Sequence, residues 1–441
     1  MNYLFLDVYK EAHYRISKDT AGGYGTSNDL GDGIFGSVAS RVIKKSIFWP
    51  NLSFAQLLQQ LVSQGHHCRY KRVGENCDIP ILDGIDAILI CSSIVCFETE
   101  IKWLNAISSF FLKPIIMCGT FISKTPLTLP DNCIILSGNY ELIDLKIFQD
   151  PSLIFGLKDN ELVFGKDTDA ANQLVTIRWG ENGLPIPKNA LISGQKAFLP
   201  VIFNRGCPYS CSEYCTYPTT QGRKVFSPSI DNTIKNLKEL ASLYPGAHVV
   251  FRDPVFSIDI KQAKDLLGEI VNSDLDLEFS AELHLRNLDE EFIKLASKAK
   301  FTTLKFGIES AFEHIRKSVK RISVDNDEQF HKISLLKRNN IKSVGMFILA
   351  QPSDTYETCI GTIEYSKALS LNIAQYSVFT PYPGTATYKF MESEITAKQF
   401  ENFNQYQLVY QHKTLSQKQV RQLLEKAYMS FALSRAAKFW T

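Results

Sequence analysis

The chain has 441 residues, of which 45% are hydrophobic and 21% are charged. This is the composition of a folded globular protein, and at roughly 150 residues per domain it leaves room for two or three domains. It excludes disordered, collagen-like and coiled-coil chains. The net charge of +2, from 48 Lys and Arg against 46 Asp and Glu, provides no overall field to attract nucleic acid or an anionic membrane. We therefore expect neither as a partner.

The sequence gives no sign of membrane insertion or export. The best apolar stretch, Ala87 to Phe97, is too short to span a bilayer and contains two serines. The amino terminus lacks the basic segment of a secretory signal, and Asp7 interrupts its apolar run. We therefore expect a cytoplasmic protein. Ten cysteines are too few for a disulfide scaffold, and in a reducing compartment they are free to bind metal.

Strand and helix patterns alternate in the first third of the chain. Strands are expected at residues 2–8, 87–91, 114–118 and 133–136, and helices at 53–65 and 98–111. This alternation predicts a doubly wound α/β domain with a parallel sheet over residues 1–145. A long polar loop with several glycines follows the first strand.

A second series of strands and helices begins near residue 198, after a linker at residues 146–197. Strands are expected at 199–204, 248–251, 277–283, 303–308, 343–349 and 373–379, and helices at 230–244, 260–271, 289–297, 326–339 and 356–369. Six such units predict a partial (β/α)₆ barrel over residues 198–390, short of the eight of a closed TIM barrel. In the segment 391–441, a helix at residues 417–434 is expected to pack on the barrel.

Three cysteines, Cys207, Cys211 and Cys215, lie together directly after the first barrel strand. Ligand sites gather at this carboxyl edge of parallel sheets. A structural zinc site needs four ligands, and no histidine or fourth cysteine lies near this loop. Three thiolates can instead bind three irons of a [4Fe–4S] cluster and leave the fourth iron open to a small molecule. Zinc and three unliganded cysteines are the alternatives.

The run from Arg205 to Cys211, followed by Cys215-Thr216-Tyr217-Pro218, resembles the radical SAM superfamily. The resemblance extends over residues 198–388. It includes segments that end later strands, at residues 251–254, 307–310, 347–352 and 381–385. It implies that the open iron chelates S-adenosylmethionine, and that one electron splits this molecule to give a 5′-deoxyadenosyl radical. It also implies an external electron donor of the flavodoxin or ferredoxin type.

The resemblance implies roles for individual residues. Cys207, Cys211 and Cys215 would bind the cluster, and the residues that would hold S-adenosylmethionine are Tyr214, Glu282, Glu309, Ser310 and Arg321. In the family, the aromatic residue before the last cysteine approaches the adenine, and an arginine pairs with the carboxylate. Candidate catalytic acids and bases, chosen by position alone, are Glu213, Asp253, Glu282 and His284. A surface or capping role is the alternative for each residue other than the cysteines.

The cysteine spacing departs from the family pattern. Three residues and then two are usual, whereas three residues separate Cys211 from Cys215, with Glu213 in the position of an insertion. This spacing resembles a radical SAM diol dehydratase of aminoglycoside biosynthesis, which removes a sugar hydroxyl. It implies a dehydratase, a lyase of antibiotic biosynthesis.

The doubly wound domain before the barrel resembles the cobalamin-binding domain of the B12-type radical SAM class. Gly119 and Gly138 follow two of its strands, where that class has glycine turns that approach the corrin ring. None of the eight histidines lies in a DxHxxG motif, which supplies the cobalt ligand in many cobalamin proteins. Two alternatives follow: cobalamin bound without a histidine ligand, or a domain that has lost its cofactor.

The polar loop carries His13, Arg15, Lys18 and Asp19. Long loops in compact folds are often functional. If this loop covers the barrel mouth, these side chains are placed to bind a hydroxylated or amino-bearing substrate. The alternative is an ordinary solvated loop.

The leading hypothesis is a radical SAM enzyme that abstracts hydrogen from a polar small molecule, such as an aminosugar or cyclitol, with dehydration or rearrangement to follow. The alternative within the class is methyl transfer from methylcobalamin to an unactivated carbon. The alternative of another class is a non-catalytic iron–sulfur protein, which would bind iron without cleaving S-adenosylmethionine.

Overall fold

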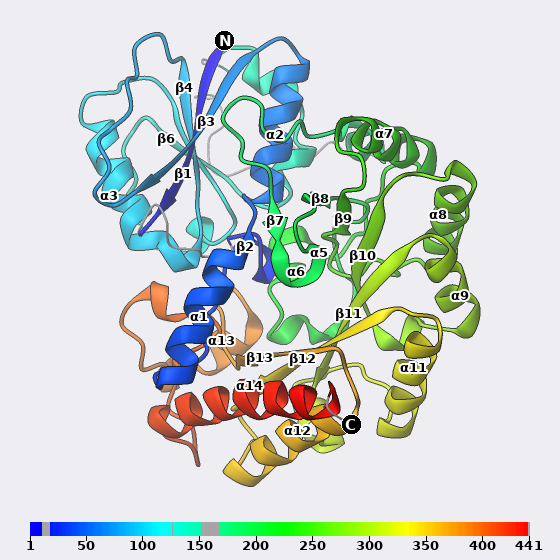
Figure 1. The fold of residues 1–441 in the computed structure, drawn as a ribbon. Helices are drawn as coiled ribbons and strands as arrows, with labels where there is room; N and C mark the ends of the chain where they lie inside the picture. The colour runs from blue at the N-terminus through cyan, green and yellow to red at the C-terminus, as the bar shows by residue number, and fades with distance from the viewer. Residues whose placement is uncertain (11–17, 126, 151–152, 154–167, 440–441) are drawn as a thin grey trace.

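The computed structural model describes residues 1–10, 18–125, 127–150, 153 and 168–439. Two parallel sheets, each accompanied by helices, lie next to each other (Figure 1). Within the described part of the chain, no helix has both the length and the apolar character needed to cross a membrane.

The amino-terminal sheet has five parallel strands in the order β3-β1-β4-β5-β6. The strands are β1 (Asn2–Tyr9), β3 (His67–Gly74), β4 (Ala87–Cys91), β5 (Ile115–Cys118) and β6 (Cys133–Leu136), and the helices are α1 (Ile34–Ser46), α2 (Leu52–Ser63) and α3 (Phe97–Ser108). The central strands β1 and β4 are almost wholly buried, which explains why most of their residues are apolar. The expected doubly wound α/β domain is confirmed.

The second sheet has six parallel strands in sequence order, from β13 to β8. The strands are β8 (Phe198–Val201), β9 (His248–Phe251), β10 (Glu278–Leu283), β11 (Phe301–Glu309), β12 (Lys342–Leu349) and β13 (Ile373–Val378). The helices between them include α7 (Ile230–Leu243), α8 (Ile260–Ser273), α9 (Glu290–Lys298), α11 (Asn326–Arg338) and α12 (Tyr356–Ala368). The expected partial (β/α)₆ barrel is confirmed.

Elements from outside the barrel lie along its open side, between β8 and β13. The short strands β2 (Ile47–Phe48) and β7 (Lys188–Asn189) pair antiparallel, and β7 lies against β8. The carboxyl-terminal helix α14 (Gln417–Phe439) packs on β13, as expected, and α1 contacts both α14 and α5 (Ala190–Ser193). The open side is therefore covered by the carboxyl-terminal helix, by α1 of the amino-terminal domain and by the segment between the two sheets.

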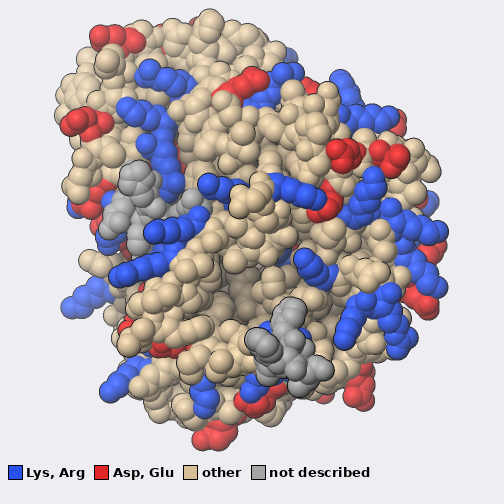
Figure 2. Space-filling model, in the orientation of Figure 1, with Lys and Arg blue, Asp and Glu red and all other residues tan. Residues whose placement is uncertain are grey.

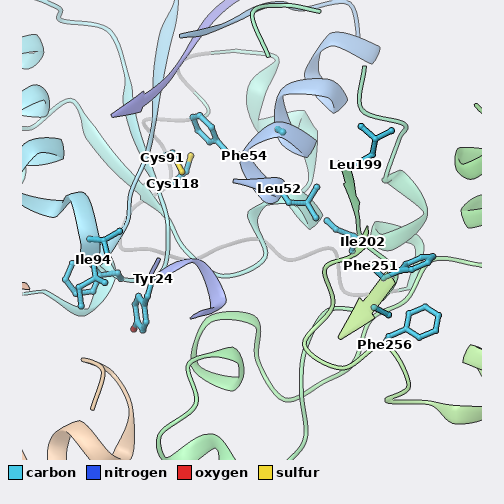
Figure 3. Close-up of a cluster of buried hydrophobic side chains, with 14 of the residues drawn as sticks. Tyr24, Leu52, Phe54, Cys91, Ile94, Cys118, Leu199, Ile202, Phe251 and Phe256 are labelled. Atoms are coloured by element: carbon cyan, nitrogen blue, oxygen red, sulfur yellow. The ribbon is translucent and has the colours of Figure 1, made fainter. Parts of the chain in front are cut away.

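One continuous apolar core runs through both domains. Figure 3 shows part of it: Cys91 and Cys118 lie on neighbouring strands of the amino-terminal sheet, Tyr24 lies near Ile94, and Phe251 belongs to the barrel. Because buried side chains of the two domains contact one another, the domains form one packed body.

A buried histidine makes the stability of the barrel depend on pH. His248 is fully buried; its Nε2 lies 2.9 Å from Ser280 Oγ, and its ring stacks on Phe198 with the centroids 5.3 Å apart. Burial lowers the pKa of His248 from 6.5 to about 4. The unfolded chain takes up this proton near pH 6.5 and the folded chain does not, so stability present above pH 6.5 is lost as the pH falls toward 4.

We expect this histidine to contribute a loss of about 2–3 kcal/mol in the free energy of unfolding between pH 6.5 and pH 4. Denaturant titrations of the cluster-free chain at several pH values measure it. The variant His248→Gln should show a shallower pH dependence, and the same change at exposed His331 should leave it unaltered. If the free energy of unfolding changed equally with pH in both variants, the expectation would be contradicted.

Candidate active site

The loop after β8 brings the three cysteines together. The 3₁₀ turn Ser210–Glu213 shapes the loop, and the N–H of Cys215 donates to the carbonyl oxygen of Cys211 at 3.0 Å. This bond joins residues four apart, as in one turn of an α-helix, where such residues lie on the same side. The three-residue spacing therefore places the thiols of Cys211 and Cys215 within hydrogen-bond reach of each other. Cys207 and Cys211 are buried, and Cys215 is half-buried.

The three thiols differ in acidity. The hydrogen bond with Cys215 lowers the pKa of Cys211 to about 6, against the effect of burial and with the help of the charge of Arg321. Burial raises the pKa of Cys207, and the hydrogen bond with Cys211 raises that of Cys215. Metals bind thiolates, so the lowered pKa of Cys211 favours its ligand form.

The thiols fit a cluster better than a single metal ion. Nowhere in the described ranges do three His, Cys, Asp or Glu side chains converge as closely as one ion requires. A structural zinc site needs four ligands on one ion, whereas a [4Fe–4S] cluster with an open iron takes three thiolates, one on each of three irons. The donor set of this loop, three cysteines at a strand end, matches the cluster.

A buried ion pair stands beside the cysteines. Arg321 Nε lies 3.3 Å from Glu309 Oε1, with side chains 11% and 10% exposed, and Arg321 Nη2 donates to the carbonyl oxygen of Gly307 at 3.0 Å. Arg321 also hydrogen-bonds the thiol of Cys211. Glu309 ends β11 with φ +67°, a conformation that is uncommon outside glycine and is concentrated at functional sites. Burial raises the pKa of Glu309, and Arg321 opposes that rise.

A cavity of about 320 Å³ opens inside the barrel next to Cys215. Most of its walls are apolar, with lining residues that include Leu30, Ile43, Ile47, Trp49, Leu191, Ile192, Val344, Met346, Ile348, Ile373, Val378 and Phe379. Figure 2 shows a hollow near the centre of one face, bordered mostly by uncharged atoms. Three of the predicted site residues, Tyr214, Cys215 and Glu282, line the cavity.

Charged side chains gather at one part of the cavity wall. Arg252 Nη1 lies 3.8 Å from Glu282 Oε2, and the Arg252 guanidinium lies 5.7 Å from the centre of the Trp49 ring. Lys305 of β11 also lines the cavity. Burial, helped by the charge of Arg252, lowers the pKa of Lys305 to about 8. Sequence reasoning missed Lys305, although a lysine within the apolar run of β11 is a signal of an inward-facing charge.

The structure places four other predicted residues away from the cavity wall. Glu213 pairs with Lys320, and its side chain is 40% exposed. Asp253 Oδ1 accepts two backbone N–H groups, each at 2.8 Å. His284 uses both ring nitrogens, one 2.7 Å from a backbone carbonyl and one accepting a backbone N–H at 3.2 Å. Ser310 Oγ accepts the N–H of residue 312 at 3.2 Å. Of the four predicted acids and bases, Glu282 is the one that lines the cavity.

The edge where the amino-terminal domain meets the barrel leaves little free space. The glycine turns at Gly119 and Gly138 border a cavity of only about 40 Å³, together with residues of the barrel loop such as Thr220 and Gln221. A Cβ atom on Gly119 would lie 2.6 Å from the carbonyl oxygen of Ser92. A cavity of this size holds one or two water molecules. A corrin ring does not fit between the domains as they are packed here.

Sequence comparisons agree with this architecture. The model of the Radical SAM superfamily matches residues 201–365. An uncharacterized methyltransferase of Pyrococcus horikoshii is 24% identical over 399 residues, which are 82% of this chain and 85% of the relative. A bacteriochlorophyllide d C-12(1)-methyltransferase of Chlorobaculum tepidum is 22% identical over 226 residues, 49% of this chain and 48% of the relative. The chain thus spans about half the length of this second relative.

Solved structures share the fold of the whole chain. The radical S-adenosylmethionine methyltransferase TsrM of Kitasatospora setae, with cobalamin and a [4Fe–4S] cluster bound, matches with a TM-score of 0.64 and 15% identity, over 97% of this chain and 85% of that one. The cobalamin-dependent radical enzyme OxsB, with aqua-cobalamin and S-adenosylmethionine bound, matches with a TM-score of 0.64 and 12% identity, over 100% of this chain and 66% of that one. The superfamily match implies a [4Fe–4S] cluster and S-adenosylmethionine, and the thiols and the buried ion pair fit both. The chain therefore carries a radical SAM domain, preceded by a domain with the fold that cobalamin-dependent radical SAM enzymes have in this place.

Proposed function

We propose that the chain is an enzyme that acts on a carbon–hydrogen bond of a small molecule bound in the barrel cavity. One observation carries the proposal: Cys215 of the cluster loop lines the same cavity as Tyr214 and Glu282. When bound, the cluster and S-adenosylmethionine together supply a carbon radical able to abstract a hydrogen atom. The residues of this chain hold the two molecules against each other and exclude water from the cavity.

The ion pair beside the cysteines suits the polar end of S-adenosylmethionine. The guanidinium of Arg321 matches a carboxylate, and the carboxylate of Glu309 matches an ammonium group. Tyr214 lies on the cavity side of the loop, with its ring centroid 6.0 Å from that of Phe379. Such a pair of aromatic rings suits a flat adenine ring.

The cavity walls favour a substrate with an apolar body. A sugar with hydroxyls on every side would leave several of them without hydrogen-bond partners against these walls, which is costly. Arg252 and Lys305 stand together with Glu282 at the cavity wall, and Asp19 of the amino-terminal domain also pairs with Arg252. We propose that Lys305, with Arg252 beside it, binds an anionic or hydrogen-bond-accepting group of the substrate.

Two outcomes of the reaction are supported by different observations. The cysteine spacing and the narrow space at the domain interface favour hydrogen abstraction followed by dehydration or rearrangement, with Glu282 placed to move a proton. The relatives named as methyltransferases favour methyl transfer to a carbon, and they support it better than they support dehydration.

Product analysis tests the proposal and separates the two outcomes. The reconstituted chain is incubated with S-adenosylmethionine, a strong reductant, hydroxocobalamin and small apolar molecules that carry a carboxylate. Abstraction followed by dehydration or rearrangement gives 5′-deoxyadenosine without S-adenosylhomocysteine. Methyl transfer gives S-adenosylhomocysteine and a product one methylene heavier. Neither product from a chain with an intact cluster would contradict the proposed function.

The charge of Lys305 should make substrate binding depend on pH. Because the pKa of Lys305 is about 8, its side chain is charged below pH 8 and neutral above it. We expect KM for an anionic substrate to rise about tenfold as the pH increases through 8, the effect of losing one partly buried charge pair. Lys305→Met should abolish this rise and Lys305→Arg should retain the low KM at high pH. A pH profile of KM that is the same in all three proteins would exclude the role.

A further inference from the structure

The amino-terminal sheet reverses its strand order at β1, which lies between β3 and β4. In doubly wound sheets, ligands bind beyond the carboxyl ends of the strands at such a switch point. In this chain the side chain of Lys18 lies there and is fully buried. We call residues 18–24 the bridging segment; His13 and Arg15 of the same loop lie outside the described residues. Lys18 is therefore not a solvated loop residue, and it does not face the barrel cavity.

Lys18 is held by groups from three elements of the amino-terminal domain. Its Nζ lies 3.2 Å from Asp7 Oδ1 on β1 and 2.8 Å from Glu100 Oε1 on α3, and it donates to the carbonyl oxygen of Cys91, the last residue of β4, at 2.9 Å. Burial alone lowers the pKa of Lys18, but Glu100 and Asp7 outweigh it and raise that pKa well above its usual value. Removing Lys18 would leave two buried carboxylates without their cation, which is strongly destabilising.

The rest of the bridging segment is fixed between the two domains. Asp19 Oδ2 accepts a hydrogen bond from Arg252 Nε at 2.9 Å, and the side chains of both residues are at least 90% buried. The hydroxyl of Tyr24 donates to the carbonyl oxygen of Pro383 at 2.6 Å, and its ring stacks on Tyr382 with the centroids 5.1 Å apart. A large ring over the strand ends would have to displace these contacts.

One of the glycine turns is also engaged with the barrel. Asn139, next to Gly138, donates to the carbonyl oxygen of Gln221 at 2.9 Å. Glu141 Oε1 lies 2.7 Å from Nε of Arg205, and both side chains are almost fully buried. Arg205 stands two residues before the first cluster cysteine. The turn therefore contacts the cysteine loop directly. Its protein groups occupy the position where the resemblance implies a corrin ring.

We propose that the amino-terminal domain binds no corrinoid, and that the bridging segment takes its place as a fixed wall of the reaction cavity. Thr20 and Ala21 of the segment line that cavity. The domain then shapes the substrate site, and the radical acts on the substrate without a second cofactor. The inference rests on the contacts above, and it depends on the proposed function only where activity is measured.

The first test is corrinoid binding by the full-length chain. The reconstituted protein is incubated with excess hydroxocobalamin and passed through a gel-filtration column, and bound corrinoid is read from its visible absorbance. We expect no corrinoid above a protein-free blank, and no rise in melting temperature on adding hydroxocobalamin, since a ligand that binds the folded state raises it. Retention of one corrinoid per chain would overturn the inference, whether or not the enzyme is active.

The activity measurement separates this inference from the proposed function. Formation of 5′-deoxyadenosine in corrinoid-free buffer supports both. Formation only after hydroxocobalamin is added overturns the inference and leaves the proposed function standing. No deoxyadenosine under either condition counts against the proposed function, and the binding measurement then decides the inference alone.

A matched pair of variants tests the role of Lys18. Lys18→Met removes the buried cation, whereas Lys113→Met removes an exposed lysine, 52% exposed, that pairs with Asp86 in the same domain. We expect a clearly lower melting temperature and a higher substrate KM for Lys18→Met, with neither change in Lys113→Met. Equal melting temperatures for the two variants would show that the buried charge of Lys18 does not fix the bridging segment at the strand ends of the amino-terminal sheet. That result would overturn the inference.

Discussion

Cys211→Ala is expected to abolish cleavage of S-adenosylmethionine. Cys211 is buried, its pKa is lowered to about 6, and it contacts both Cys215 and Arg321. Removing one of three thiolates leaves two irons without protein ligands, so the cluster is lost or disordered. We expect a loss of more than about 10³-fold in the rate of 5′-deoxyadenosine formation, because the cluster ligands act as a unit.

Iron content and deoxyadenosine formation are measured on the same anaerobic preparation. Cys77→Ala is the control, because Cys77 is exposed and lies in the amino-terminal domain. It should keep full iron content and full activity. A Cys211→Ala protein with normal iron content and normal deoxyadenosine formation would show that the cysteine loop does not hold the reactive cluster.

Gly206→Ala is expected to give the second largest effect. Gly206 precedes the first cluster cysteine and has φ +88°, and a Cβ atom there would overlap the backbone carbonyl oxygen of Lys224. The backbone on both sides is fixed, because Arg205 pairs with Phe226 through two hydrogen bonds of 2.9 Å. The substitution therefore adds a backbone clash to a left-handed conformation. We expect it to cost about 3 kcal/mol or more in stability and to displace the cysteine loop.

Gly65→Ala separates the clash from the backbone strain. Gly65 has φ +86°, almost the same value, but no atom lies within 4 Å of an added Cβ. Gly65→Ala should lower the free energy of unfolding by only about 1–2 kcal/mol, the effect of the left-handed conformation alone. Free energies of unfolding and iron per chain are compared for both variants. If both variants lost the same free energy of unfolding and kept full iron content, the predicted clash at Gly206 would not displace the cysteine loop.

Most of the barrel could be predicted from the sequence because its strands and helices alternate regularly. Buried strands such as β9 and β12 are short apolar runs that follow helices with clear periodicity. Among the elements of the first domain that the sequence did not predict, β3 and α1 have clear physical reasons. Strand β3 is an edge strand, and exposed Arg69 and Lys71 alternate with its buried residues. Helix α1 exposes apolar residues, with Ile34 88% exposed, so its pattern does not indicate a buried face.

The site was only partly predictable for a different reason. Residues only a few positions apart, such as Cys211 and Cys215, can be predicted from the sequence to lie close together. Contacts between distant segments do not: Lys18 meets Glu100, and Asp19 meets Arg252, only in the folded chain. The charges at the cavity and the packing of the bridging segment between the two domains depend on such contacts. For this reason, glycine turns that the sequence assigns to a corrinoid prove to border a closely packed interface.

Low-temperature EPR of the dithionite-reduced wild-type protein, with and without S-adenosylmethionine, tests the central claim most directly. The claim is that Cys207, Cys211 and Cys215 hold a [4Fe–4S] cluster whose fourth iron is open to a ligand. We predict a reduced [4Fe–4S] signal whose g values shift when S-adenosylmethionine is added. A reduced cluster signal that S-adenosylmethionine leaves unchanged would mean that no iron is open, and would contradict the account.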